Sequence, residues 1–96
     1  RSFWDSTYKE DSWYTSFLPK PINLFPEIHQ DIRKYYPGTK IALTEYNFGG
    51  FNHVSGGIAV ADLLGVCAKH EIYMANFWGP LREYVSGSFK LYRNYD

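Results

Sequence analysis

Apolar and polar positions follow two different periods along this chain, and the period identifies the first element. Between residues 22 and 36, apolar side chains recur every three or four positions, at Ile22, Phe25, Ile28, Ile32 and Tyr35. That spacing predicts an amphipathic helix over residues 22–36. Asn23 can cap its start with Pro26 in the first turn, and Pro37-Gly38 ends it.

Residues 40–46 change to an apolar run that ends in a carboxylate, which predicts a strand. Strand alternation puts Ile41, Leu43 and Glu45 on one face. Between Lys40 and Glu45 neither face carries a charge, as is typical of a strand covered on both sides in a parallel sheet. Glu45 is the last charged side chain before the chain turns at Gly49-Gly50. A glutamate that is simply solvated at a strand end gives the same local pattern.

The second half of the chain predicts a helix, a strand and a terminal helix. Residues 55–69 are almost entirely apolar, with Ser55 as the N-cap, and their small residues let this helix lie buried against a sheet. The strand over 72–78 has one face that runs from apolar residues to Asn76 and Trp78. Residues 86–95 predict a terminal amphipathic helix. Two strands joined by a helix predict a right-handed β-α-β unit.

Residues 1–19 have poor periodicity and many charges, which predicts a long loop. Loops of this length inside compact domains are usually functional or disordered. The loop carries two tryptophans, Trp4 and Trp13, and of these Trp4 is the better candidate for a ligand contact. Packing of both indole rings onto the rest of the fold explains them equally well.

Composition narrows the classes of function. Ten basic and ten acidic residues give a formal net charge of zero, so nothing indicates a nucleic acid or an anionic membrane as partner. No apolar run approaches the roughly 20 residues of a membrane span. The single cysteine, Cys67, excludes an internal disulfide and is interpreted as a core residue. His29 has no cysteine or second histidine at ligand spacing, so neither a metal nor another cofactor is predicted.

Aromatic residues make up 20% of the chain, with nine Tyr, seven Phe and three Trp. Aromatic faces stack on the C–H surfaces of sugar rings while their polar edges still form hydrogen bonds. Ordinary core and interface packing accounts for the same composition. Sugar binding is therefore a hypothesis that composition raises without deciding.

Four stretches, taken in order, resemble one known family. They are RSFWD with DSW at 1–5 and 11–13, IALTEYN at 41–47 with the glycines after it, GIAVADLLG at 57–65, and FKLYRNYD at 89–96. They are similar to glycoside hydrolase family 44, the endoglucanase and xyloglucanase family. The resemblance implies an α/β fold, a fragment of a (β/α)8 TIM barrel covering roughly its last two to three β/α units, because a whole barrel needs about 250 residues. Residues 1–96 would then be one partial catalytic domain, with the loop 1–19 over the substrate cleft.

The resemblance also implies a chemistry. Glu45 matches the family's nucleophile, in a retaining endo-β-1,4-glucanase that hydrolyses cellulose-type β-glucans or xyloglucan. Retaining enzymes need a second carboxyl group about 5–5.5 Å away as acid and base. The family carries that residue on its fourth strand, and nothing in this chain corresponds to it. We therefore expect half of a catalytic pair, inactive by itself.

The remaining expectations concern substrate and partners. Trp4 and Trp78 are expected to stack on sugar rings, and Tyr46, Asn47 and His53 to form hydrogen bonds with a β-glucan substrate. The resemblance implies a secreted enzyme whose remaining barrel and an accessory β-sandwich lie outside these residues. Two alternatives stay open, a non-catalytic carbohydrate-binding domain and a small α/β domain with a structural role.

Overall fold

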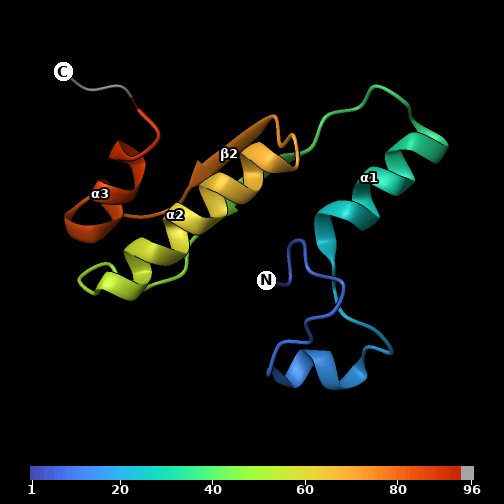
Figure 1. Cartoon of the computed structure of the whole chain (residues 1–96), viewed down its shortest axis with the longest axis horizontal. Coiled ribbons are helices and arrows are strands. Elements are labelled where there is room, and N and C mark those ends of the chain that lie inside the picture. The colour runs from blue at the N-terminus through green and yellow to red at the C-terminus, as the bar shows by residue number, and fades with distance from the viewer. Residues whose placement is uncertain (94–96) are drawn as a thin grey trace. The chain divides into compact units, whose positions relative to one another are not determined.

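The computed structural model describes residues 1–93, and the chain forms two compact units, Arg1–Thr39 and a second unit that begins at Lys40. In chain order the elements are η1 (Trp13–Phe17), α1 (Leu24–Tyr35), β1 (Ala42–Tyr46), α2 (Val54–Lys69), β2 (Met74–Phe77) and α3 (Glu83–Lys90) (Figure 1). This order of helices and strands confirms the predicted mixed α/β class. Residues 94 and 95 of the predicted terminal helix lie outside the described residues.

The first unit contains an element that the sequence did not predict. The 3-10 helix η1 lies within the predicted loop 1–19. Its turn closes on the Ser12 carbonyl, which accepts hydrogen bonds from the Thr15 backbone N–H at 3.1 Å and from the Thr15 hydroxyl at 2.9 Å. One short turn held by such local bonds has no apolar period, so a periodicity argument cannot detect it.

Helix α1 confirms the predicted helix within one or two residues at each end, but its start differs from the prediction. Asn23 occupies the N-cap position with φ 46°, and its side chain makes no capping hydrogen bond. The reason is that the loop backbone takes that role. The Leu24 N–H donates to the Ser2 carbonyl at 3.1 Å, and the Phe25 N–H donates to the Phe3 carbonyl at 2.8 Å. Phe25 is fully buried and stacks on the Phe3 ring, with the two centroids 5.2 Å apart.

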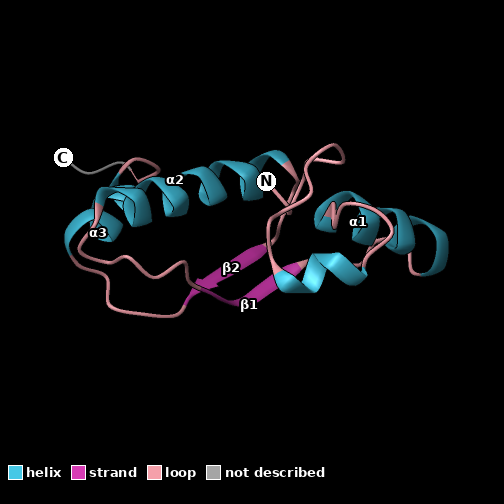
Figure 2. Cartoon of the chain, turned by 90° about the horizontal axis from the view of Figure 1, so that it is seen from below, coloured by secondary structure: helices cyan, strands magenta, loops and turns pink. Residues whose placement is uncertain are grey.

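The second unit is a β-α-β unit, in which β1 and β2 pair in parallel and α2 lies along one face of the pair (Figure 2). Strand β2 is shorter than the predicted 72–78. The Ile72 N–H donates to the Cys67 carbonyl at 2.9 Å and so belongs to the end of α2, and Glu71 has φ 53° at the turn. Cys67 is buried, as interpreted from the sequence, and burial raises the pKa of its thiol.

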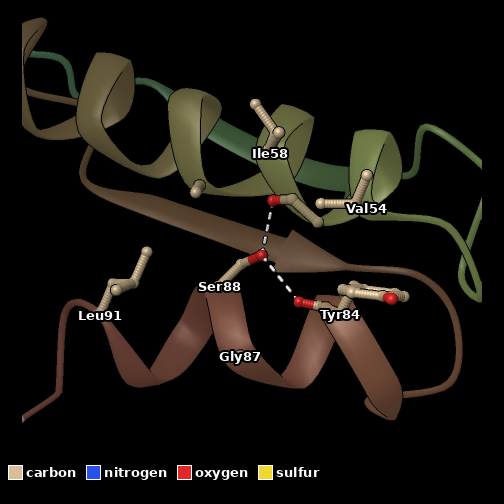
Figure 3. A pocket seen from close by; sticks show the side chains of 8 residues that line it. Val54, Ile58, Tyr84, Gly87, Ser88 and Leu91 are labelled. Atoms are coloured by element: carbon tan, nitrogen blue, oxygen red, sulfur yellow. Dashed lines mark hydrogen bonds between the residues drawn. The ribbon is translucent and has the colours of Figure 1, made fainter.

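Helices α2 and α3 pack closely against each other (Figure 3). A Cβ at Gly57 would lie 2.8 Å from Cβ of Tyr84, so this glycine permits the approach. The Ser88 hydroxyl donates to the Gly57 carbonyl at 2.5 Å and lies 3.1 Å from the Tyr84 carbonyl. The small residues of α2 were expected to lie against a sheet. Gly57 instead lies against α3, which the sequence pattern of one helix cannot reveal.

Helix α3 begins three residues before the predicted start at 86 and ends at Lys90. Its buried positions, Val85 and Ser88, are three apart, which turns one helical face toward α2. Beyond the end of the helix, the Tyr92 hydroxyl donates to the Ala61 carbonyl of α2 at 2.8 Å. An apolar groove of about 250 Å³ lies between α2 and α3, with Val54, Ile58 and Leu91 among its lining residues (Figure 3).

Candidate functional site

The two strands do not pair one residue to one. Leu43 is opposite Ala75 and Tyr46 is opposite Phe77, so Thr44 and Glu45 together face the single residue between them on β2, Asn76. An extra residue on one strand is a β-bulge, a feature that is uncommon between parallel strands and that re-aims side chains beside active sites. The register therefore changes at the residue that the sequence singled out.

The bulge decides on which face Glu45 lies. Tyr46 is only 7% exposed, and its ring lies 5.5 Å from the ring of Phe77 on the side covered by helices. Thr44 and Glu45 are both exposed. The prediction that Glu45 shares a face with Ile41, which is buried, is wrong, because the extra residue reverses the alternation. Within the described residues of the second unit, helices cover one face of the sheet, and Glu45 stands on the other.

Asn47 joins the ends of the two strands. Its Nδ2 donates to the Trp78 carbonyl, and its Oδ1 accepts from the Gly49 N–H at 2.6 Å. The Trp78 N–H donates to the Tyr46 carbonyl at 3.0 Å. Residue 79 is a glycine with φ 152°, and a Cβ there would lie 3.0 Å from Nδ2 of Asn47. Glu45, Asn47 and Trp78 thus gather at the carboxyl edge of the sheet.

The other predicted site residues lie elsewhere. The Tyr46 hydroxyl is buried without a partner among the described residues, and burial, then the nearby Cys67, raises its pKa. This placement does not favour substrate binding by Tyr46, which stays a prediction. Trp4 belongs to the first unit and is partly buried.

His53 is the N-cap of α2, where the sequence predicted Ser55. Its Nδ1 accepts from the Ser55 N–H at 3.2 Å and lies 2.8 Å from the Ser55 hydroxyl oxygen. Because Nδ1 is an acceptor in this bond, the ring proton of the neutral histidine sits on Nε2. The exposed edge of the ring can therefore still donate a hydrogen bond.

Sequence reasoning ranked Trp13 below Trp4 as a ligand contact and did not identify the exposed aromatic cluster that Trp13 forms with Phe17 on η1. Trp13 is 80% exposed and Phe17 is 76% exposed, and each ring meets the other edge-on with centroids 6.2 Å apart. The Glu10 carboxylate supports the cluster, since it accepts from the Ser2 hydroxyl and, at 2.9 Å, from the Ser12 hydroxyl. Those two bonds, that of Ser2 first, lower the pKa of Glu10. The signal available in the sequence was the four-residue spacing of Trp13 and Phe17, which follow Ser12.

The chemistry available at the sheet edge is that of one carboxylate. No hydrogen bond or ion pair joins the Glu45 side chain to another residue within 1–93. Over the same residues, no group of three His, Cys, Asp or Glu side chains is placed to hold a metal ion. None of the described helices is both long and apolar enough to cross a membrane. A single exposed carboxylate can act as a nucleophile or a base and needs a second group for acid catalysis.

No family model matches the chain, but two curated relatives match it along its whole length. It is 49% identical over 98 residues to endoglucanase A of Paenibacillus lautus and spans 14% of that protein. It is 41% identical over 106 residues to β-mannanase/endoglucanase A of Caldicellulosiruptor saccharolyticus and spans 8% of it. The chain thus matches only a small part of each relative.

Three solved structures match all of this chain as well. A Paenibacillus polymyxa xyloglucanase from glycoside hydrolase family 44 has 50% identity and a TM-score of 0.88, with 20% of its chain covered. A family 44 endoglucanase from Clostridium thermocellum has 47% identity and a TM-score of 0.91, with 19% covered. A bifunctional glucanase-xylanase from a metagenome library has 35% identity and a TM-score of 0.84, with 18% covered.

Proposed function

We propose that this chain, which is similar along its whole length to enzymes of glycoside hydrolase family 44, supplies the nucleophile of a retaining endo-β-1,4-glucanase. The similarity confirms the resemblance predicted from the sequence and covers about a fifth of the matching structures. We call the longer enzyme to which we assign the chain the parent enzyme. The observation that carries the proposal is the bulge that leaves Glu45 exposed at the carboxyl end of β1.

In the proposed reaction, the Glu45 carboxylate attacks the anomeric carbon of a β-glucan while an acid protonates the leaving oxygen. A covalent glycosyl-enzyme forms, and water then hydrolyses it with net retention of configuration. We assign the acid to another segment of the parent enzyme, because nothing in this sequence corresponds to the acid/base residue that the family resemblance implies.

The rest of a TIM barrel would complete the sheet. Strands β1 and β2 pair only with each other, so each has a free backbone edge within the described residues. Neighbouring strands satisfy such edges in closed barrels. An accessory β-sandwich and secretion of the parent enzyme belong to the same proposal, since a polymeric substrate requires hydrolysis outside the cell.

Exposed aromatic residues are the proposed sugar contacts. Trp78 is 68% exposed at the sheet edge that carries Glu45, and the η1 cluster offers Trp13 and Phe17. We assign cellulose-type β-glucans or xyloglucan as substrate, in keeping with the names of the relatives, endoglucanases and a xyloglucanase. A stand-alone carbohydrate-binding module is not favoured, because such modules are mostly β-sandwiches and this chain alternates helices with two parallel strands.

The decisive experiment is Glu45→Gln in the parent enzyme, with Glu71→Gln as the matched control. Glu71 lies at the opposite, amino end of β2, so its replacement should leave turnover within about twofold of the wild type. Loss of the nucleophile should reduce kcat by several powers of ten while oligosaccharide binding persists. Activity within tenfold of the wild type would contradict the assignment.

A second arm separates a nucleophile from an acid. Azide should restore turnover of an activated aryl β-cellobioside by Glu45→Ala. The azide occupies the vacated face, so the product should be the glycosyl azide of inverted configuration. A product of retained configuration would assign Glu45 to the acid/base role instead.

A further inference from the structure

We propose that Asn47 is a positioning residue that holds Trp78 against the substrate through the backbone of Trp78. Asn47 was predicted to contact the sugar itself. The inference rests on the proposed sugar contact of Trp78 and adds the residue that places this contact. It follows from three features of the sheet edge. These are the hydrogen bonds of Asn47, the end of the backbone hydrogen bonding between β1 and β2, and the exposure of Trp78.

Both ends of the Asn47 amide are already engaged within the protein. Nδ2 donates to the Trp78 carbonyl, 31 residues away in the sequence, and Oδ1 accepts from the Gly49 N–H at 2.6 Å. The first bond ties the end of β2 to the loop after β1, and the second fixes the amide that makes it. These two bonds fix the orientation of the amide, so its role in the sheet edge is to hold the backbone at Trp78.

The amide stands where a backbone donor is missing. The last ladder bond runs from the Trp78 N–H to the Tyr46 carbonyl at 3.0 Å. In a regular parallel ladder, the N–H two residues past Tyr46 would donate to the Trp78 carbonyl. The chain instead turns at Gly49, which has φ 66°, and the Asn47 side chain supplies the donor. The side chain thus extends the pairing by one bond at the point where the candidate sugar contact is displayed.

Trp78 depends on this bond for its place. Trp78 is 68% exposed, and any displacement of its backbone carries the ring with it. The next residue, Gly79, has φ 152° and would otherwise allow the chain to turn freely. Asn47 lies directly against Gly79, since a Cβ at that glycine would come within 3.0 Å of Nδ2.

A double-mutant cycle in the parent enzyme tests the proposal. Asn47→Ala should raise the Kd for cello-oligosaccharides about three- to tenfold, and Trp78→Ala should raise it at least as much. In the Trp78→Ala background, Asn47→Ala should have no further effect, because its contribution passes through the ring. Asn52→Ala, an exposed asparagine of the same loop, is the control and should leave the Kd unchanged. Effects of Asn47→Ala and Trp78→Ala that multiply would mean that Asn47 binds the sugar directly and would overturn the proposal.

A second measurement reads the position of the ring without any sugar. In parent enzyme labelled with 5-fluorotryptophan, Asn47→Ala should shift or broaden the fluorine resonance of Trp78, and the resonances of Trp4 and Trp13 should stay in place. Unchanged lines for those two tryptophans also show that the variant folds. An unchanged Trp78 resonance refutes the positioning role. A changed resonance together with a Trp78→Ala variant of normal affinity refutes only the sugar contact assigned to Trp78.

Discussion

Gly56 supports the loop that follows the Glu45 strand, and its replacement by alanine should disturb that loop. A Cβ at Gly56 would lie 2.3 Å from the Gly50 carbonyl oxygen and 2.8 Å from the Gly49 carbonyl oxygen. Both contacts are to backbone atoms, so no side-chain rotation relieves them. Gly49 also donates to Asn47, and movement of the loop therefore reaches the carboxyl edge of the sheet.

The geometry sets the size of the effect. Ordinary contact begins at 3.4 Å, so the Gly50 carbonyl must retreat by about 1 Å. Overpacking of this kind costs about 1–3 kcal/mol, and alanine returns up to about 1 kcal/mol through its better helix propensity. We expect a net loss of about 1–2 kcal/mol in local stability. Gly87→Ala is the control, because Gly87 lies in α3 with nothing within 4 Å of the added Cβ and should gain about 0.5–1 kcal/mol.

Hydrogen exchange followed by mass spectrometry measures both effects in the parent enzyme. Peptides from the first turns of α2 should exchange about 5- to 30-fold faster in Gly56→Ala, and peptides from α3 should exchange more slowly in Gly87→Ala. Turnover should fall in Gly56→Ala and stay unchanged in Gly87→Ala. If the α2 peptides of Gly56→Ala exchange as slowly as in the wild type and turnover is unchanged, the loop does not depend on the glycine and the reasoning fails.

Four further predictions concern Trp78, Asp5, His53 and the isolated chain. Trp78→Ala should weaken oligosaccharide binding by about 1 kcal/mol, measured by titration calorimetry, and a loss of thermal stability alone would place the ring in the core. The pKa of Asp5 is lowered from 3.8 to about 2, chiefly by the Thr7 hydroxyl and N–H, so its stabilisation of the loop is fully present above pH 3.8. That stabilisation should be lost as the pH falls through 2. Faster hydrogen exchange of the Thr7 amide would measure the loss, and Asp5→Asn should remove this pH dependence. His53→Ala should destabilise the start of α2 by about 1 kcal/mol while His53→Asn preserves it, measured by exchange at the Ser55 amide. The 96-residue chain alone should release no reducing sugar from carboxymethyl-cellulose, and Glu45-dependent release would mean that a second catalytic carboxylate is present.

Local patterns determined much of the fold from the sequence. The three- and four-residue spacing around Phe25 identifies α1, and the change to an apolar run identifies the strand that carries Glu45. Each of these signals comes from neighbours along the chain, because backbone geometry repeats every 3.6 or 2 residues. The same strand, with three other stretches, was enough to indicate the family.

Capping and helix packing depended on segments far away in the sequence. Asn23 looks like a capping residue, yet the backbone of residues 2 and 3 satisfies the start of α1. Gly57 looks like a residue that packs on a sheet, yet it lies against α3. A sequence shows which groups need partners, and only the folded chain shows which partner reaches each group first.

The face of Glu45 is the clearest case of a decision made by tertiary structure. Alternation along β1 puts Glu45 with Ile41, and that rule holds only while the strands pair one residue to one. Two residues of β1 face Asn76 alone, so Tyr46 turns into the core and Glu45 is left exposed. The sequence by itself determined that a carboxylate ends this strand. The pairing with β2 determined that the carboxylate lies exposed on the open face of the sheet, because register is a property of two strands and not of one.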